Sequence, residues 1–271
     1  MKELNGDIKL RRSEQLVYFA TNFLRGCIDS CCLLRTTFWR MRSYADGDAS
    51  PTRKYIDDFL YEQIPHLVVG KKSILEIGCG SGYLRDVLAR AGFTGRYVGL
   101  DARAYWDTEK TYPFACEVVH TPFETFVTEE RFDLICSITV LEHIVDDEAV
   151  TRKSKALLAP GGVEFHIMPA SPSLPLYLLH GYRQYGRARL QRLFRGRSFT
   201  VTRLGGFASY LLQFFAVTIP ERLTGKKLVR SRLSYSRATA IAARLDRFLP
   251  FAATMFAVIV RGDTISQEEA N

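Results

Sequence analysis

Three glycines and two acids in the first half of the chain have the spacing of a nucleoside-binding crevice. Gly78, Gly80 and Gly82 follow a short apolar run that has the composition of a strand. A backbone that bends sharply at the end of a strand and passes close to a ligand needs residues without a Cβ atom. Glu76 precedes the glycines, and Asp101 follows them after one strand-helix-strand unit. A carboxylate at that separation can accept hydrogen bonds from ribose hydroxyls.

The spacing of these glycines differs from that of nicotinamide-dependent dehydrogenases. In the dinucleotide-binding fingerprint G-x-G-x-x-G, the third glycine stands at the sixth position. Here Tyr83 occupies the sixth position, and the glycines run G-x-G-x-G. The residues behind the loop predict a helix that Gly92 can end, because apolar side chains recur there at helical spacing. These side chains are Leu84, Val87, Leu88 and Ala91.

The segment Glu76 to Gly82 resembles the E-x-G-x-G-x-G loop of the class I S-adenosylmethionine (SAM)-dependent methyltransferases, in which an acid placed like Asp101 binds the ribose. Two further blocks agree, Phe132–Ser137 with Leu141–Ile144 behind it, and Leu157–Val163. The resemblance covers roughly residues 50–170. It implies SAM as the cofactor and a Rossmann-like, doubly wound α/β fold, with a mostly parallel sheet and an antiparallel final strand.

The resemblance also implies which residues hold the cofactor. The glycine loop would approach the methionine and ribose parts of SAM, and Ala102 would border the adenine. Asp101 would accept two hydrogen bonds from the ribose hydroxyls, because an ionised carboxylate has two acceptor oxygens. The full set implied is Glu76, Gly78, Cys79, Gly80, Gly82, Asp101, Ala102, His120, Thr121 and Ser137.

Methyl transfer from a sulfonium is an in-line displacement, which depends on positioning and, for an oxygen acceptor, on loss of a proton. His143 is the candidate base, because the block that contains it faces the methyl-transfer side in related enzymes and histidine titrates near neutrality. The alternative, that His143 only caps or orients its loop, stays open. For His166 we expect a structural role on the fifth strand.

Quinone-pathway O-methyltransferases look similar around this block, and some hold a metal with a further acid three residues before the Glu-His pair. Thr139 occupies that position here. Only Glu142 and His143 remain, which is a small ligand set for a metal. We therefore expect no metal requirement.

The composition bounds the location and the partners. With 47% hydrophobic residues among 271, the chain can bury an ordinary core, and its six cysteines form no C-x-x-C pair. No signal-peptide layout or long apolar span is present, so we expect a cytoplasmic protein, peripheral on a membrane at most.

Residues 181–247 contain thirteen arginines and two lysines against Glu221 and Asp246. Such a charge favours anionic lipid, a phosphate-bearing substrate or nucleic acid.

The chain divides by pattern into residues 1–50, an amphipathic helical segment; 51–170, the SAM-binding core; 171–250, a basic and aromatic helical insertion; and 251–271, a final edge strand and tail. In the first segment, apolar residues follow helical spacing at Leu16, Phe19, Ala20, Phe23, Leu24, Cys27, Ile28 and Cys31. We expect this face to pack on the protein's own core, ahead of a membrane-surface role.

Within the core, Ser50 and Pro51 have the pattern of a helix start, and Pro65 has that of its end. Strands are then expected at 74–77, 96–101, 117–120, 132–138 and 163–168, with one helix after the first strand and another at about 147–158. A last helix and strand are expected at 234–248 and 254–260. This alternation predicts a parallel sheet with helices on both faces. Ligands of such sheets lie at the carboxyl ends of the strands.

The insertion contains seventeen uncharged residues, 204–220, that are rich in aromatic side chains. This stretch is too short for a confident membrane span. It suits equally a helix in the membrane interface and a lid over the acceptor.

Three functions fit these features. The first is O-methylation of a small-molecule, lipid-linked or glycan acceptor. A nucleic-acid methyltransferase is the second, disfavoured because Ser137–Val140 replaces the Asn/Asp-Pro-Pro-Tyr motif of enzymes that methylate base nitrogens. The third is a non-catalytic SAM-binding subunit at a membrane. The acceptor and the oligomeric state are not predicted.

Overall fold

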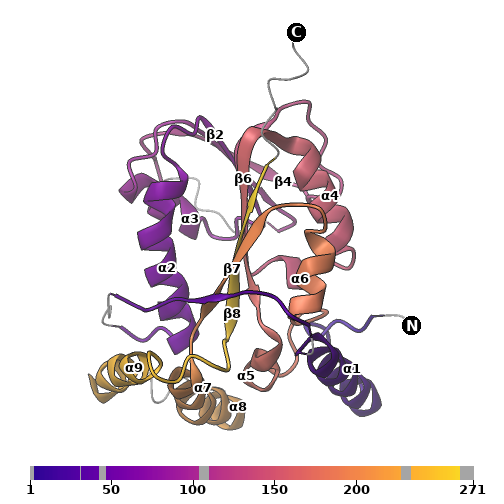
Figure 1. The fold of residues 1–271 in the computed structure, drawn as a ribbon, viewed down its shortest axis with the longest axis vertical. Helices are drawn as coiled ribbons and strands as arrows, with labels where there is room; N and C mark the ends of the chain where they lie inside the picture. The colour runs from indigo at the N-terminus through magenta and orange to yellow at the C-terminus, as the bar shows by residue number, and fades with distance from the viewer. Residues whose placement is uncertain (1–2, 31, 43–46, 104–109, 227–232, 263–271) are drawn as a thin grey trace.

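The computed structural model describes residues 3–30, 32–42, 47–103, 110–226 and 233–262 (Figure 1). Cys31 of the predicted apolar face, Arg230 and Arg232 of the basic insertion, and the predicted tail beyond residue 262 lie outside the described residues. One eight-stranded sheet runs through the molecule in the order β1-β7-β8-β6-β5-β2-β3-β4. The strands are β1 (Thr37–Phe38), β2 (Ser73–Ile77), β3 (Arg96–Asp101), β4 (Ala115–His120), β5 (Phe132–Ile138), β6 (Leu158–Pro169), β7 (Phe199–Leu204) and β8 (Met255–Arg261).

The predicted fold class is confirmed. β2 pairs in parallel with both β3 and β5, β3 pairs in parallel with β4, and β5 pairs in parallel with β6. From β2 the chain builds outward to β3 and β4, and then returns to β5 on the other side of β2. The strand order therefore reverses between β2 and β5, and the crevice at such a reversal is where open α/β sheets bind ligands.

The final strand is antiparallel as expected, but the expectation that it forms an edge is wrong. β8 lies between β6 and β7 and pairs antiparallel with both. β7 arises inside the predicted helical insertion, which is therefore not wholly helical, and β1 adds a further strand outside β7. The run of consecutive apolar residues in β8 is typical of a strand with neighbours on both sides, because nearly all of its side chains are buried.

Helices cover both faces of the sheet, as expected. They are α1 (Arg12–Ser30), α2 (Pro51–Leu67), α3 (Tyr83–Arg90), α4 (Asp147–Leu157), α5 (Leu174–Tyr177), α6 (Arg187–Leu193), α7 (Phe207–Gln213), α8 (Ile219–Thr224) and α9 (Leu233–Leu245), with 3₁₀ turns η1 (Leu141–His143) and η2 (Ser171–Ser173) and a π-helical turn η3 (Phe214–Thr218). In Figure 1, α2 and α3 flank one side of the sheet, and α4 and α6 flank the other. Neighbouring strand residues alternate between the two hydrophobic clusters, with Ile74 on the α2 side and Leu75 on the α6 side.

Two helix predictions at α2 had different outcomes. The Ser50 hydroxyl accepts a hydrogen bond from Arg53 N–H, and Pro51 begins the helix, as predicted. Pro65 does not end the helix, which continues to Leu67. The reason is packing, because Ile64 is fully buried in the core and the local cost of one missing backbone donor is outweighed.

The expected orientation of α1 is also wrong. Its apolar residues face solvent, with Leu16 72% exposed, Phe23 64% and Ile28 70%. On the side that faces the protein, Tyr18 is buried with Leu10 and Leu174, and Phe19 of the predicted face packs against them. Polar contacts add to this packing, since the Tyr18 hydroxyl donates to His180 O at 2.7 Å and Arg25 pairs with Glu3 at 2.8 Å. These contacts fix the helix with most of its apolar face outward.

Candidate active site

All three glycines of the loop between β2 and α3 have a backbone that disfavours other residues. The φ angles are +70° at Gly78, +50° at Gly80 and +86° at Gly82. A Cβ atom on Gly78 would lie 2.4 Å from the Val140 side chain, whereas a Cβ on Gly80 would meet nothing within 4 Å. The loop is therefore held closely against the chain that follows β5, and it is open on the side of Gly80.

Asp101 joins the end of β3 to this loop. One carboxylate oxygen accepts the Gly80 N–H at 2.8 Å, and the other accepts the Arg103 N–H at 2.8 Å. Each oxygen retains a further lone pair, so the carboxylate can also accept ribose hydroxyls. The structure thus brings together the two features that the sequence placed 21 residues apart.

Glu76 lies beneath the loop rather than at its surface. It is 3% exposed, and it accepts a hydrogen bond from the Tyr97 hydroxyl at 2.5 Å. Burial raises the pKa of Glu76 to about 8, although the Tyr97 hydrogen bond and the Arg85 charge act in the opposite direction. Burial likewise raises the pKa of the neighbouring Cys79 thiol to about 12. Glu76 and Cys79 therefore favour their uncharged forms at pH 7, and the loop packs on two uncharged groups.

The residues implied for the adenine side also meet. Asp101 and His120 are register partners at the ends of β3 and β4. The His120 ring nitrogen Nε2 lies 2.9 Å from Ala102 O, and Thr121 follows directly. These residues form the side of the crevice next to the glycine loop.

Ser137 is not brought to the crevice. Its side chain is fully buried, and its hydroxyl lies 2.8 Å from His166 Nδ1. His166 is also fully buried, stacks on Phe194 with ring centroids 5.8 Å apart, and lies 3.3 Å from Glu164. The structural role expected for His166 is therefore confirmed, and the Ser137 hydroxyl serves the same interior network.

A second group of titratable side chains lies beyond the end of β5. We call Asp7, Glu142, His143 and His180 the histidine cluster. Asp7 Oδ2 lies 2.6 Å from His143 Nδ1, and Asp7 Oδ1 lies 3.5 Å from His180 Nδ1. On the far sides of the rings, Glu142 Oε1 lies 4.0 Å from His143 Nε2 and 3.8 Å from His180 Nε2. Both imidazoles therefore stand between one half-exposed and one buried carboxylate.

Close backbone packing places Asp7 and His180 beside η1. Gly6 N–H donates to Gly181 O at 2.6 Å, and Gly181 N–H donates to the Asp7 carboxylate at 3.0 Å. Gly181 has φ +60°, and a Cβ there would lie 2.5 Å from Glu142 O. The sequence analysis missed Asp7 and His180 because their contacts are long-range, and the isolated glycines beside them were the one local signal.

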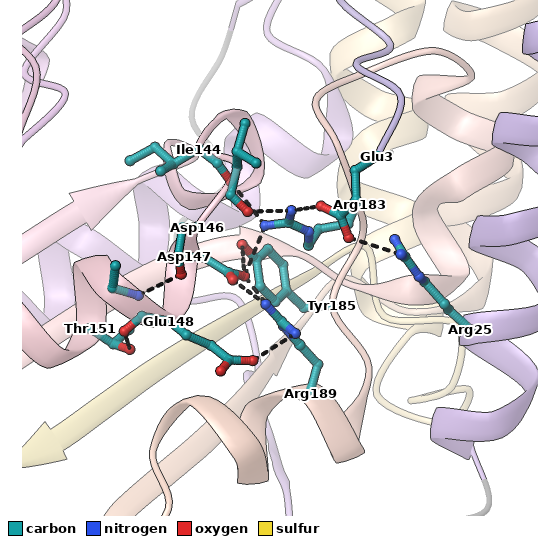
Figure 2. Close-up of polar contacts among 12 residues, drawn as sticks. Glu3, Arg25, Ile144, Asp146, Asp147, Glu148, Thr151, Arg183, Tyr185 and Arg189 are labelled. Carbon is teal, nitrogen blue, oxygen red and sulfur yellow. Dashed lines mark hydrogen bonds and ion pairs between the residues drawn. The ribbon is translucent and has the colours of Figure 1, made fainter. Parts of the chain in front are cut away.

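Figure 2 shows the ion-pair network that anchors these segments. Asp147, fully buried at the start of α4, pairs with Arg189 and with Arg183 Nη1 at 3.2 Å. Arg183 also pairs with Glu3 and donates to Ile144 O at 2.9 Å. The network ties the N-terminal segment and the chain after Gly181 to the end of η1.

This network neutralises part of the positive charge of residues 181–247. Arg183 and Arg189 are neutralised as described, Arg197 pairs with buried Glu164 at 2.6 Å, and Arg203 donates to Pro250 O at 2.7 Å. These four arginines offer little to an anionic partner at the surface, whereas others of the same stretch are exposed: Arg192, Arg195, Arg222, Arg237, Arg244 and Arg247.

The surroundings of the histidine cluster favour the charged forms of both Asp7 and His180. Partial burial would raise the pKa of Asp7, but hydrogen bonds from Gly181 N–H and His143 and the charges of both histidines hold it below its ordinary value. Burial would lower the pKa of His180, yet the Glu142 and Asp7 carboxylates raise it above its ordinary value. A histidinium at position 180 is therefore stabilised in the absence of any other cation.

The structure places a third potential metal ligand beside the two that the sequence pattern offered. Glu142, His143 and His180 each offer one ligand atom, and these atoms lie within 4.8 Å of one another. Both carboxylate oxygens of Glu142 are buried without a hydrogen-bond partner among the described residues. His180 thus supplies the third ligand atom that was missing from the sequence pattern.

Comparison with known proteins identifies the same core. A family model described as a methyltransferase domain matches residues 51–205. Curated relatives include the ubiquinone biosynthesis O-methyltransferase of Actinobacillus pleuropneumoniae serotype 5b, 32% identical over 35% of this chain and 44% of that protein. The enzyme of the same name from Dinoroseobacter shibae is 38% identical over 33% of this chain and 38% of that protein. The chain therefore matches less than half the length of these relatives.

Solved structures share the fold. The [4+2]-cyclase SpnF has a TM-score of 0.50 at 17% identity, covering 97% of this chain and 99% of SpnF. The N-methyltransferase NodS from Bradyrhizobium japonicum WM9, in complex with S-adenosylhomocysteine, has a TM-score of 0.50 at 14% identity, covering 89% and 98%. At these identities the likeness establishes the architecture alone.

Replacing Asp101 tests the cofactor site. We expect Asp101→Asn to weaken SAM binding about 10- to 100-fold in calorimetry, because hydrogen bonds to a charged group contribute about 1.5–3 kcal/mol. Glu129→Gln, a change at an exposed acid outside the crevice, should bind SAM normally. Unchanged affinity in folded Asp101→Asn would show that the carboxylate does not hold the ribose.

Glu76 predicts a pH dependence of stability. Its raised pKa means that the folded protein keeps a proton that the unfolded chain releases above its ordinary pKa of 4.5. Stability therefore falls as pH rises from there to about 8, by at most about 1.4 kcal/mol per pH unit for this group. In urea denaturation, the advantage of Glu76→Gln over the unaltered protein should grow across this window. A difference independent of pH would contradict the assignment of a protonated Glu76.

Proposed function

We propose, because the chain belongs to the family of SAM-dependent methyltransferase domains, that it methylates an oxygen atom of a small-molecule acceptor. The observation that carries the proposal is that two groups of residues lie at the carboxyl ends of neighbouring parallel strands. The glycine loop and Asp101 follow β2 and β3, and the histidine cluster follows β5, the strand beside β2. Cofactor and acceptor would then face each other where the strand order reverses.

Methyl transfer needs the cofactor site and the histidine cluster to act on the same acceptor. The acceptor oxygen forms a bond to the methyl carbon while the sulfonium–carbon bond breaks, and that bond's electron pair stays on sulfur. Holding both reactants in line supplies much of the acceleration. The acceptor must also lose a proton, and we assign acceptance of that proton to the histidine cluster, with His143 of η1 as the accepting imidazole.

Loss of His143 should slow methyl transfer without loss of the cofactor. We expect His143→Ala to reduce transfer from labelled SAM into the small-molecule fraction of a cell extract about 10²- to 10⁴-fold. SAM affinity should be unchanged, since His143 lies outside the glycine loop. The control is His66→Ala, which removes an exposed imidazole from α2.

Two outcomes would contradict different parts of the proposal. Full transfer by folded His143→Ala would remove the role of this residue alone. Absence of label in every extract fraction, with SAM binding intact, would argue against methyl transfer itself and favour a non-catalytic SAM-binding subunit.

We further propose a lipid-linked or glycan acceptor reached from an anionic membrane surface. The outward face of α1 supports this, because its exposed apolar side chains adjoin the exposed cations Lys9, Arg11 and Arg12. Of the two acids of α1, Asp29 is buried, so only Glu14 stands against these three exposed cations. An apolar face bordered by cations is the pattern of a helix that lies in a membrane interface.

The arrangement of the helices suits the same surface. In Figure 1, α1, α5, α7 and α8 gather at one end of the molecule. Phe215 in the π-helical turn is 62% exposed and Leu223 in α8 is 81% exposed. None of the helices in the described part of the chain is long and apolar enough to cross a membrane. Contact with the surface of the bilayer therefore rests on these exposed side chains.

Vesicle sedimentation tests this membrane contact. We expect the protein to bind vesicles of mixed phosphatidylglycerol and phosphatidylcholine, and Phe23→Ser with Ile28→Ser to weaken binding at least about tenfold, because burying each side chain contributes about 1.5–3 kcal/mol. Val127→Ser, at an 89% exposed position between β4 and β5, is the matched control. Equal binding by the double variant, or no binding by the unaltered protein, would exclude the α1 surface.

A further inference from the structure

We propose that a cavity between α1, α6 and the start of β8 binds a small carboxylic acid, whose carboxylate is held by Arg187 and Arg203 and whose apolar body packs on Phe251 and Phe256. We call this space the α1–β8 cavity. Its volume is about 190 Å³, and Asp29 of α1 also lines it. None of the described residues of the glycine loop or of the histidine cluster lines it, so the site is independent of the proposed function.

The two arginines bring hydrogen-bond donors to the cavity that have no partner in the described protein. Arg203, near the end of β7, donates from Nη1 to Pro250 O at 2.7 Å, but its Nε is buried without a partner. Arg187, the first residue of α6, makes no ion pair with any described residue. Buried donors without partners are rare and call for an explanation. A carboxylate can accept from two arginines at once, because its two oxygens offer about four lone pairs.

The two guanidinium groups also repel each other. Burial, and after it the charge of Arg187, lower the pKa of Arg203 below its ordinary value. Arginine nevertheless keeps its proton in proteins, so loss of charge does not relieve the repulsion. An anion between Arg187 and Arg203 would relieve it and would supply the missing partner of Nε.

The charge of the lining selects a monoanion. Asp29 is the one acid among the described residues that line the cavity, against two arginines. Burial raises the pKa of Asp29, and the charges that act most against this are those of Arg192 and Arg189, which lie outside the lining. One positive charge is therefore in excess. A carboxylate brings one negative charge, whereas a phosphate monoester brings about 1.5 to 2 at pH 7.

The apolar wall and the volume limit the body of the ligand. Arg203 and Phe256 are register partners on the paired strands β7 and β8, so their side chains lie on the same face of the sheet. Phe251 packs on Phe207, with ring centroids 4.9 Å apart, and remains 50% exposed. Since a cavity of about 150 Å³ can hold benzene, the α1–β8 cavity suits a single ring or a chain of about six carbon atoms.

The larger cavity beside it is less suited to an anion. That cavity, of about 320 Å³, shares a lining residue with the α1–β8 cavity and is lined by four arginines. Three of them are already paired, because Arg25 and Arg183 share Glu3, and Arg189 pairs with Asp147 (Figure 2). Free donors beside an apolar wall are therefore what distinguishes the α1–β8 cavity.

A ligand in the α1–β8 cavity would fasten α1 to the sheet. The lining combines Gly26 and Asp29 of α1 with Arg187 of α6 and with Arg203 and Phe256 of the sheet. In Figure 1, α1 and α6 lie on the same side of β8. A ligand that contacts all three elements stabilises their arrangement by its binding free energy. We therefore expect amide hydrogen exchange in α1 to slow when the ligand binds.

Calorimetry with cyclohexanecarboxylate tests the site. We expect a dissociation constant of about 1 mM or below, which a ligand of roughly nine non-hydrogen atoms can reach. Arg187→Met and Arg203→Met should each weaken binding at least about tenfold, because hydrogen bonds between charged groups are lost. The neutral cyclohexanecarboxamide and the dianionic cyclohexyl phosphate should bind more weakly than the carboxylate. Arg195→Met, which removes an exposed arginine outside the cavity, should bind normally.

A second measurement does not depend on the folding of variants. Nuclear Overhauser contacts should join the ring protons of bound cyclohexanecarboxylate to the aromatic protons of Phe251 and Phe256 in the unaltered protein. Absence of binding at millimolar concentrations, contacts to other side chains in place of these two, or normal affinity in folded Arg187→Met would overturn the site. Equal affinity for the carboxamide would also overturn it, because the arginines would then play no part.

The demethylated cofactor distinguishes this site from the proposed methyl-transfer site. Because the cavity lies outside the crevice, saturation with S-adenosylhomocysteine should leave the affinity for cyclohexanecarboxylate unchanged. Competition between the two ligands would place the acid in the crevice and overturn the inference. Carboxylate binding as expected, without methyl transfer to any acceptor, would refute the proposed function and support the α1–β8 cavity.

Discussion

The position of the histidine cluster depends on one buried charge, the carboxylate of Asp147. Because Asp147 is fully buried, its charge requires partners, and Arg183 and Arg189 reach it from the chain beyond Gly181. Removing one partner of a buried ion pair typically costs about 3–5 kcal/mol, so these contacts fix the path of that chain. Arg183 carries the constraint onward to Glu3. Both histidine-cluster residues that lie far from η1 in sequence are held in place through this network.

The cofactor side is built in a different way, from contacts between neighbouring elements. Asp101 binds Gly80 across two adjacent strands, and positive φ angles at the glycines shape the loop between them. Residue types with such strict backbone requirements are visible in the sequence itself. For that reason the loop, Asp101 and the strands that carry them could be predicted from spacing. Ser137 is the exception. Whether a side chain at the end of a strand points into the crevice or into the interior depends on the elements that pack against the sheet, and residue spacing does not give these.

The remaining errors share one physical cause, which is that tertiary contacts override local patterns. The apolar face of α1 was predicted to be inside, yet Tyr18 and Arg25 bind the protein through the polar face. β8 was predicted at an edge, although its uninterrupted apolar run fits a strand with two neighbours. The missing neighbour was β7, whose mixed Phe199–Leu204 sequence does not distinguish a strand inside a basic segment. Asp7 and His180 have no local pattern beyond the isolated glycine beside each of them.

This contrast bears on how such a chain can change its acceptor while it keeps its cofactor. The residues proposed for the cofactor also serve the fold, since the bond between Asp101 and Gly80 links the end of β3 to the loop after β2. The histidine cluster is assembled from η1, the N-terminal segment and the chain after α5, which meet through side-chain pairs, close glycine contacts and a few backbone hydrogen bonds. Segments joined in this way can be exchanged without disturbing the sheet. The part of the site that we propose for the acceptor is therefore built from the contacts that sequence patterns reveal least.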